Sequence, residues 1–425
     1  MNRRVSLGLA FAMMLLVAAF TFSIATDIAE RRVNEKMVSL RERERSQAKY
    51  AEIDREVREN YNGVIDETLL LDSVARGYLA GIGDPYATYY DARTYERILR
   101  AQNNPTADIG AVLRANPDGY LTVLEVYPDS PAMSANIKEG DLIVKIDEID
   151  LTPENSLVML EYIQGEQGSR ITLTVRSDNI DRIEELTRRV VIVPSVYARM
   201  IGDTMTGYIL ITEFGDHTSD QFNLALRRIT GAGARSIIFD VRDNGGGKLS
   251  AAARILDRLV PTGMIASSFA RDGSISVLYT SDAYEIELPM VVLVNGGTAS
   301  SAELFAQVLR DYEKARIVGT QTAGKGVMQR IITLTDGSAI EITVAKLVSP
   351  RGEIFDDSGI RPDYDISIDG NWQGLDETLD PQLKKALEVA VASHRTSDPP
   401  AQQEAPPAEE SRAPQQNGMP SAGSG

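Results

Sequence analysis

Residues 239–259 read FDVRDNGGGKLSAAARILDRL, in which an apolar strand runs into a glycine turn and then into a helix. The same order returns at residues 290–312, where MVVLV precedes the turn NGGTASS and the helix AELFAQVLRDY. Strands that alternate with helices predict an α/β domain with a largely parallel sheet. The pattern covers the second half of the chain, with strands at 208–211, 237–241, 290–294, 316–318 and 331–334 and helices at 219–229, 249–259, 302–312 and 381–394.

The amino-acid composition excludes several classes of partner, metal site and catalytic nucleophile. Of 425 residues, 44 are basic and 61 acidic, and the formal charge of −17 argues against nucleic-acid partners, because phosphate binding needs a basic face. The lack of cysteine excludes disulfides, thiolate metal sites and cysteine nucleophiles. His217 and His394 are too few for a histidine-rich metal site. Neither of these kinds of metal site is therefore expected, and hydrolysis would have to use Ser, Thr, Lys, Asp or Glu.

The N-terminus has the pattern of an export signal. MNRR precedes an uncharged, apolar run from Val5 to Thr26. This run of 22 residues is also long enough to cross a bilayer as a helix, and the two arginines place the N-terminus inside. Residues 1–26 are thus interpreted as a retained membrane anchor or as a signal cleaved after Ala25. Both interpretations place the rest of the chain outside the cytoplasm.

Residues 27–95 have the pattern of helices. Charged residues dominate from Asp27 to Tyr61, and sparse apolar residues near helical spacing predict a helix that is either solvated or in need of a partner. A second helix is predicted over 66–82, and GDP at 83–85 ends it. We expect the first helix to pair with a second copy of the chain in a homodimer. The proline-rich tail, 396–425, lacks apolar periodicity and is predicted to be disordered.

The next segment has the pattern of a small β-rich domain. Its predicted elements, within residues 96–180, are strands at 109–113, 121–126, 140–146 and 171–175 and a helix at 156–163. Their order, with the turn SPA and the strand EGDLIVKID, resembles a PDZ domain. The resemblance implies that a peptide C-terminus adds as a strand beside Ile109, Gly110, Ala111 and Val112. A purely structural role is the alternative, and the charged stretch 176–189 is expected to be a hinge.

Three segments carry candidate chemistry. The triple-glycine turn can present bare amides to a developing oxyanion, or it can be a tightly packed loop. Ser300 and Glu303 fit a capping box, and the same geometry places a serine hydroxyl at a helix N-terminus. Lys325 lies in GTQTAGKG, whose spacing matches half of a phosphate loop. Gly326 stands where that loop needs Ser or Thr for magnesium, and a strand pattern follows, so no nucleotide site is expected.

The three segments in this order resemble the C-terminal processing peptidases, which are the serine–lysine, tail-specific proteases of family S41. The likeness extends from about Leu69 to Leu387 and includes GDPYATYY, DVRDNGGG, NGGTASSAE, GTQTAGKGVMQ, SPRG and GIRPD. It implies a protease core of the ClpP/crotonase type, here over residues 181–395, that works without a cofactor.

The resemblance also implies roles for individual residues. Ser300 would be the nucleophile, Lys325 the general base, and Gln329 the residue that orients the lysine amine. Ser301 is an adjacent alternative, but the spacing to the lysine selects Ser300. Asp311 matches an acidic residue of the family, and we interpret it as structural.

A lysine base needs a special environment, because a free lysine titrates at roughly 10.4, far above neutral pH. The acidic surroundings of this chain favour the ammonium, so only burial can favour the neutral amine. The oxyanion would be bound by the backbone amides of Ser301 and Gly246, or of Gly247 in place of Gly246.

The expected architecture is a multidomain α/β protein with an N-terminal anchor and helices, a PDZ-like domain, an α/β protease core and a disordered tail. We expect an exported, membrane-anchored serine endopeptidase that engages substrate proteins through apolar C-termini. A proteolytically inactive PDZ scaffold of the cell envelope is the alternative.

Overall fold

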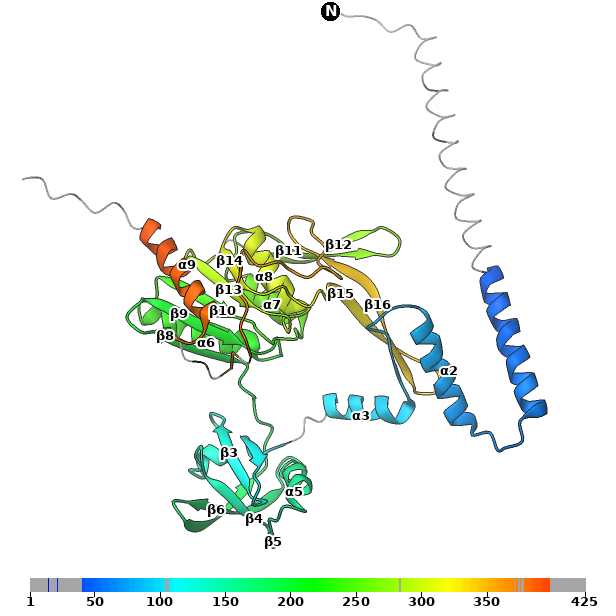
Figure 1. Cartoon of the computed structure of the whole chain (residues 1–425), viewed down its shortest axis with the longest axis horizontal. Helices are drawn as coiled ribbons and strands as arrows, with labels where there is room; N and C mark the ends of the chain where they lie inside the picture. The colour runs from blue at the N-terminus through cyan, green and yellow to red at the C-terminus, as the bar shows by residue number, and fades with distance from the viewer. Residues whose placement is uncertain are drawn as a thin grey trace, which may run out of the picture. The chain divides into compact units, whose positions relative to one another are not determined.

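The computed structural model describes residues 14, 21, 40–103, 107–282, 284–370, 372, 373, 375 and 378–397 (Figure 1). The predicted anchor or signal, residues 1–26, lies outside them apart from residues 14 and 21, and the predicted tail lies outside them from residue 398 on. Within the described ranges, no helix combines the length and the apolar character that a membrane span requires.

Two helices precede the first strand. The first covers residues 40–60 and is exposed along its whole length, with its large apolar side chains 41–53% exposed. This exposure matches the predicted helix that is solvated or in need of a partner. The second helix, α2 (Glu67–Gly81), agrees with the prediction for 66–82 within one residue at each end. The chain divides into two compact units within α2, and the second unit begins at Ala75.

The predicted β-rich domain is present as an antiparallel sheet. Its strands pair in the order β2-β3-β4-β6-β7, with β5 beside β4, around buried residues such as Ile143 and Leu173. The elements are β2 (Ala111–Ala115), β3 (Leu121–Val126), α4 (Pro131–Ser134), β4 (Leu142–Ile146), β5 (Ile149–Asp150), α5 (Ser156–Tyr162), β6 (Arg170–Ser177) and β7 (Ile180–Thr187). β2 forms one edge of this sheet and contacts α5.

The hinge predicted over residues 176–189 is wrong. These residues end β6 and form β7, which pairs with β6 from Ser177↔Ile180 to Arg170↔Thr187. β7 is the other edge strand of the sheet, where charged side chains are common. Asp181 and Glu185 are exposed, and Arg182 and Glu184 are partly exposed. A run of charges therefore indicated an exposed strand here and not a linker.

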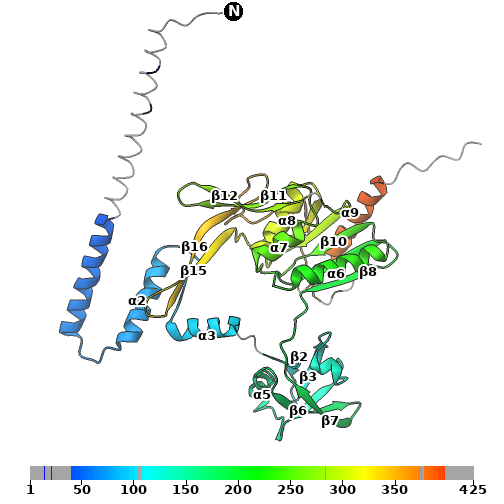
Figure 2. The same ribbon diagram turned by 180° about the vertical axis from the view of Figure 1, so that it is seen from behind.

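The second half of the chain forms a six-stranded sheet with helices on both faces (Figures 1 and 2). The strands pair in the order β17-β14-β13-β10-β9-β8, and every neighbouring pair is parallel except β9 with β8. The predicted, largely parallel α/β core is confirmed. Its elements are β8 (Val196–Ile201), β9 (Thr206–Ile211), α6 (Thr218–Gly231), β10 (Ser236–Asp240), α7 (Leu249–Leu256), β13 (Met290–Val294), α8 (Ser301–Asp311), β14 (Ala315–Gly319), β17 (Tyr364–Asp365) and α9 (Pro381–Ser397).

Alternating side chains of this sheet build two hydrophobic cores. On β10, Ile237 and Phe239 join the core that includes α6, α7 and α8. Ile238 points to the opposite face and packs with Leu383 and Ala386 of α9. Burial of both faces explains why these strands are continuous apolar runs in the sequence.

A second, antiparallel sheet is organised around β16. This strand pairs with β1, β11 and β15, and β11 pairs with β12. The strand predicted at 331–334 belongs to β15 and thus lies outside the parallel core, because an apolar run indicates a strand but not its partner. The elements are β1 (Thr88–Tyr90), α3 (Ala92–Asn103), β11 (Gly263–Ala270), β12 (Ile275–Ser281), β15 (Val327–Thr333) and β16 (Ala339–Val348).

Candidate active site

Ser300 lies at the sharp junction of β13 and α8. Its backbone has φ 56° and ψ −120°, a conformation that costs an L-residue about 1–3 kcal/mol and is typical of nucleophiles held on a strand-to-helix turn. Its amide donates to Glu303 Oε2 at 2.9 Å, as a capping box requires. A capping box also uses the Ser300 hydroxyl oxygen, as the acceptor for the Glu303 amide, so both interpretations involve that oxygen. They are compatible because a hydroxyl oxygen can accept a hydrogen bond in the cap while its own proton passes to a base.

Ser300, Lys325 and Gln329 line one cavity of about 360 Å³. The lysine lies on the turn between β14 and β15, and the glutamine lies on β15 itself. The structure thus brings together three residues that were predicted from separate segments. The other lining residues are Gly245, Gly247, Leu249, Ser301, Val327, Met328 and Leu347.

Glycines allow the lysine turn to pack closely against the segment before β17. A Cβ on Gly324 would lie 2.9 Å from the amide nitrogen of Gly359, and a Cβ on Gly326 would lie 2.5 Å from the amide nitrogen of Asp356. Both neighbours are backbone atoms, which cannot rotate away as a side chain can. Residues 324 and 326, on either side of the lysine, therefore have to be glycine for steric reasons.

The buried carboxylate of Glu303 joins the serine turn to the lysine turn. Its Oε2 accepts from the backbone amides of Ser300 and Lys325, both at 2.9 Å. Its Oε1 accepts from the Gly324 amide at 2.8 Å and from the Thr322 hydroxyl at 2.5 Å. The residue is 0% exposed, and the four donors compensate for the burial of its charge. One carboxylate therefore positions the backbone of both predicted catalytic residues.

Ser301 lines the cavity, but its hydroxyl is engaged by the chain itself. The residue is 1% exposed, and its hydroxyl donates to the Gly247 carbonyl at 3.3 Å. Its amide is the first of α8, where the helix itself supplies no acceptor. This arrangement suits the predicted oxyanion donor better than it suits a competing nucleophile.

The glycine turn presents Gly247 to the cavity. Gly246 was the first choice for the second oxyanion donor, but its amide donates to Asn244 Oδ1 at 2.8 Å. Gly245 and Gly247 line the cavity on either side of it. A Cβ on Gly247 would lie 2.5 Å from the Phe214 carbonyl oxygen, so this residue has to be glycine. The geometry favours Gly247, the alternative named from the sequence, over Gly246.

Polar contacts bind the glycine turn to the serine turn. The side-chain amide of buried Asn244 donates to the Ile211 carbonyl at 2.9 Å. The backbone carbonyl of Asn244 accepts from the Ala299 amide, also at 2.9 Å. The Asn295 side chain accepts from the Asp243 amide and donates to the Asp243 carboxylate, both at 2.8 Å. The sequence analysis missed these links, because their partners lie 33 to 55 residues apart in the chain.

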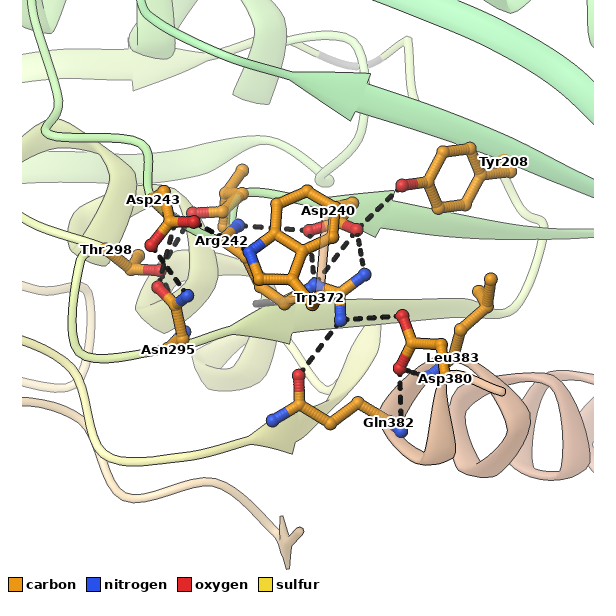
Figure 3. A network of polar contacts seen from close by, with 11 residues as sticks. Tyr208, Asp240, Arg242, Asp243, Asn295, Thr298, Trp372, Asp380, Gln382 and Leu383 are labelled. Atoms are coloured by element: carbon orange, nitrogen blue, oxygen red, sulfur yellow. Dashed lines mark hydrogen bonds and ion pairs between the residues drawn. The ribbon is translucent and has the colours of Figure 1, made fainter. Parts of the chain in front are cut away.

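A buried charge network lies at the base of the glycine turn (Figure 3). Arg242 is 2% exposed and pairs with Asp240 at 2.6 Å and with Asp380 at 2.8 Å. The Trp372 ring lies 3.9 Å from the guanidinium carbon, and its indole nitrogen donates to Asp243 at 2.7 Å. Burial opposes the charge of Arg242, but hydrogen bonds to Asp240 and the carboxylate charges raise its pKa above the ordinary value. The network thus ties the end of β10 to the start of α9.

Asp311, the acidic residue that was interpreted as structural, accepts from the Ser349 hydroxyl, the Arg351 amide and the Gln307 side chain. It does not line the cavity. Among the described residues, no group of three or more His, Asp or Glu side chains is arranged to hold a metal ion.

Tyr86, which precedes the small β-rich domain in the sequence, contacts two residues of the candidate site. The Lys325 ammonium nitrogen lies 5.1 Å from the centre of the Tyr86 ring, and Gln329 Nε2 donates to the Tyr86 carbonyl at 2.9 Å. The sequence analysis used GDPYATYY only as part of the resemblance. No local pattern indicates that Tyr86 reaches residues about 240 positions later.

The predicted peptide-binding residues of the small domain lie in different environments. Ile109 is 0% exposed and belongs to the domain core, so its side chain cannot contact a peptide, and its carbonyl already accepts from the Ala132 amide at 2.8 Å. Ala111 and Val112 begin the edge strand β2 and are partly buried. Gly110 has φ +79°, and its amide donates to the Asp108 carboxylate at 3.0 Å. One amide of the predicted carboxylate-binding loop thus already has a carboxylate acceptor from the chain itself.

Known proteins resemble this chain over most of its length. Residues 205–366 match peptidase family S41, and residues 122–177 match the PDZ domain. A carboxy-terminal-processing protease of Bartonella bacilliformis is 28% identical over 78% of this chain and 78% of its own length. A carboxyl-terminal-processing protease of Picosynechococcus sp. is 30% identical over 67% of this chain and 70% of its own length. Among solved structures, the photosystem II D1 C-terminal processing protease is similar at a TM-score of 0.46 and 26% identity, over 73% of this chain and 86% of that chain.

Proposed function

Since the chain belongs to peptidase family S41 and is a serine-type peptidase, we propose that Ser300 is its nucleophile and Lys325 its general base. The observation that carries the proposal is the Glu303 carboxylate, which accepts from the backbone amides of both residues. Their side chains line the same cavity. Fixed mutual geometry is the first requirement of a nucleophile and its base. Gln329, which lines the same cavity, is proposed to orient the lysine amine.

The proposed reaction is acyl transfer to serine followed by hydrolysis. The neutral Lys325 amine accepts the Ser300 hydroxyl proton while Oγ attacks the carbonyl carbon of the scissile peptide. The amides of Ser301 and Gly247 bind the resulting oxyanion. The Lys325 ammonium then donates its proton to the leaving nitrogen, the C–N bond breaks, and an ester remains on Ser300. Water, deprotonated by the same lysine, hydrolyses the ester and regenerates the serine.

The cavity favours substrates with an apolar side chain next to the scissile bond. Leu249, Val327, Met328 and Leu347 line it beside the proposed catalytic residues. Burial of an apolar side chain contributes about 1.5–3 kcal/mol, whereas burial of an unpaired charge is unfavourable. We therefore expect cleavage to follow apolar residues.

The PDZ-like domain is proposed to engage apolar C-termini of substrate proteins. β2 is the terminal strand of its sheet and contacts α5, so a peptide can add to the outer edge of β2. Asp108 competes for the Gly110 amide, so apolar peptide side chains have to supply much of the affinity.

Residues 1–26 are proposed to export the protein and to anchor it in the membrane, because MNRR precedes an apolar run of sufficient length. The helix over 40–60 is proposed to form a homodimer, because its apolar side chains are exposed along the described helix. Light scattering on a protein that begins at Asp27 should return a dimer. A monomer at micromolar concentration would contradict the dimer proposal.

Hydrolysis of casein by the purified protein tests the catalytic proposal. Ser300→Ala is expected to abolish hydrolysis, whereas Ser301→Ala keeps a substantial fraction. Lys325→Arg is expected to be inactive, because arginine stays protonated and cannot accept the serine proton. Full activity of Ser300→Ala, or near wild-type activity of Lys325→Arg, would refute the assignment. The alternative of an inactive PDZ scaffold predicts that mass spectrometry finds no fragments with the wild-type protein.

A further inference from the structure

The turn between α2 and β1 is fixed to the second sheet by Asp84. Asp84 Oδ2 accepts from the Thr343 amide of β16 at 2.9 Å, and Oδ1 accepts from the Tyr86 amide at 3.0 Å. Immediately after the turn, β1 pairs with β16, with Tyr89 opposite Ile340. The backbone of Tyr86 is thus held from both sides by contacts with the sheet that also contains β15.

Tyr86 contacts two of the three residues proposed for catalysis. Its ring lies 5.1 Å from Lys325 Nζ, within the range of a cation–π contact, and its carbonyl accepts from Gln329 at 2.9 Å. Burial and the nearby carboxylates of Asp356 and Asp357 raise the pKa of Tyr86, so its ring carries no charge that would repel a substrate carbonyl. The contact to the lysine uses the ring, and the contact to the glutamine uses the backbone.

We propose that Tyr86 is a positioning residue of the proteolytic site, which fixes Lys325 through its ring and Gln329 through its carbonyl oxygen. This inference rests on the proposed roles of Ser300 and Lys325. A lysine side chain has four rotatable bonds, and the amine has to stay within hydrogen-bond reach of the serine hydroxyl to accept its proton. The Tyr86 ring restricts the side chain from one side. The GDPY turn, although remote in sequence, then completes the site.

The test compares variants of the full chain in detergent by two rates: casein hydrolysis and labelling by a fluorophosphonate. In the labelling reaction Oγ attacks phosphorus, fluoride leaves, and the serine proton passes to the lysine. Tyr86→Leu removes the ring and keeps the backbone carbonyl. We expect it to lower kcat and the labelling rate about tenfold, because the ring no longer restricts the lysine side chain and the amine spends less time within reach of the serine hydroxyl. KM should stay within about twofold, because Tyr86 is not expected to bind the substrate.

Two matched variants separate positioning from folding. Tyr86→Phe keeps the ring and is expected to restore both rates to within about threefold of wild type. Tyr90→Leu removes a neighbouring ring, whose hydroxyl donates to Glu341, and is expected to keep the wild-type labelling rate. Endpoint labelling counts the active sites, so that unfolded protein does not lower the measured kcat.

Loss of labelling in Ser300→Ala and in Lys325→Arg identifies the dyad independently. If these two variants behave as expected and Tyr86→Leu reacts at the wild-type rate per active site, the inference on Tyr86 is overturned. It is also overturned if Tyr86→Phe is as slow as Tyr86→Leu, because the hydroxyl would then be the important group. If Lys325→Arg is labelled like the wild type, the dyad itself is wrong, and the role of Tyr86 is refuted with it.

Discussion

Replacement of Glu303 by glutamine tests whether one carboxylate holds the two halves of the active site. Glutamine has nearly the same shape, but one carboxylate oxygen becomes an NH2 group. Each oxygen of Glu303 accepts two hydrogen bonds, one pair from Ser300 and Lys325 and the other from Thr322 and Gly324. In either orientation of the glutamine amide, its NH2 group takes the place of one carboxylate oxygen. The two groups that donated to that oxygen then lose their acceptor.

The expected effect follows from the number of donors that lose their acceptor. Each buried donor without an acceptor costs about 1–3 kcal/mol, so two of them predict a loss of about 2–6 kcal/mol. For a domain of this size, the Tm should fall by roughly 5–20 °C. A positioning loss of about 3 kcal/mol corresponds to a decrease in kcat/KM of about 100-fold.

The assay combines thermal unfolding with casein hydrolysis at a temperature well below both transitions. Glu388→Gln is the matched control, since this helix glutamate is 58% exposed in its side chain and pairs with Lys385 at 3.2 Å. Surface pairs of this kind contribute about 0–1 kcal/mol, so the control should change the Tm by less than about 3 °C. Wild-type Tm and wild-type kcat/KM in Glu303→Gln would refute the role of this carboxylate.

Arg242→Lys is expected to lower the Tm by about 10 °C, because lysine cannot pair with both Asp240 and Asp380 and also stack on Trp372. A broken buried ion pair costs about 3–5 kcal/mol. An unchanged Tm would show that this network does not stabilise the core. In anisotropy titrations, Asp108→Asn should bind a peptide with an apolar C-terminus about tenfold more tightly, because the substitution removes a negative charge beside the peptide carboxylate. Equal Kd values would show that the peptide carboxylate does not reach Gly110. Burial opposes the charge of Asp84, but hydrogen bonds from the Thr343 and Tyr86 amides keep its pKa below the ordinary value of 3.8. Its contribution to stability is therefore complete above about pH 4 and is lost as the pH falls through the lower, folded pKa. Tm measurements between about pH 2 and 5 should show a shallower acid decline in Asp84→Asn, and identical slopes would contradict this.

The parallel core could be predicted from the sequence because its strands are buried on both faces. The runs at 237–241 and 290–294 coincide with β10 and β13 within one residue. β11 could not be predicted, because the apolar residues of its sequence GMIASSFA do not alternate with polar ones and two serines interrupt them. Its strand character comes from pairing with β16 and β12, and a local pattern carries no information about such partners.

The sequence indicated candidate site residues that line one cavity, but it did not indicate the contacts that hold their segments together. Ser300 and Lys325 stand in short motifs of recognisable spacing, so the sequence could indicate them. The Gly246 amide, by contrast, has a competing acceptor in Asn244, which no motif reveals. The contact of Tyr86 with Lys325 depends on the pairing of β1 with β16 and so on the whole tertiary fold.

The strained backbone of Ser300 lowers the stability of the fold and so bears on which residue evolution keeps at this position. At φ 56° and ψ −120°, glycine would be relaxed where serine is strained. If Ser300 is the nucleophile proposed above, Ser300→Gly should raise the Tm slightly and abolish hydrolysis. Such a variant would meet no backbone strain, so on this proposal a need for cleavage, in addition to the cap of α8, retains the serine at this position.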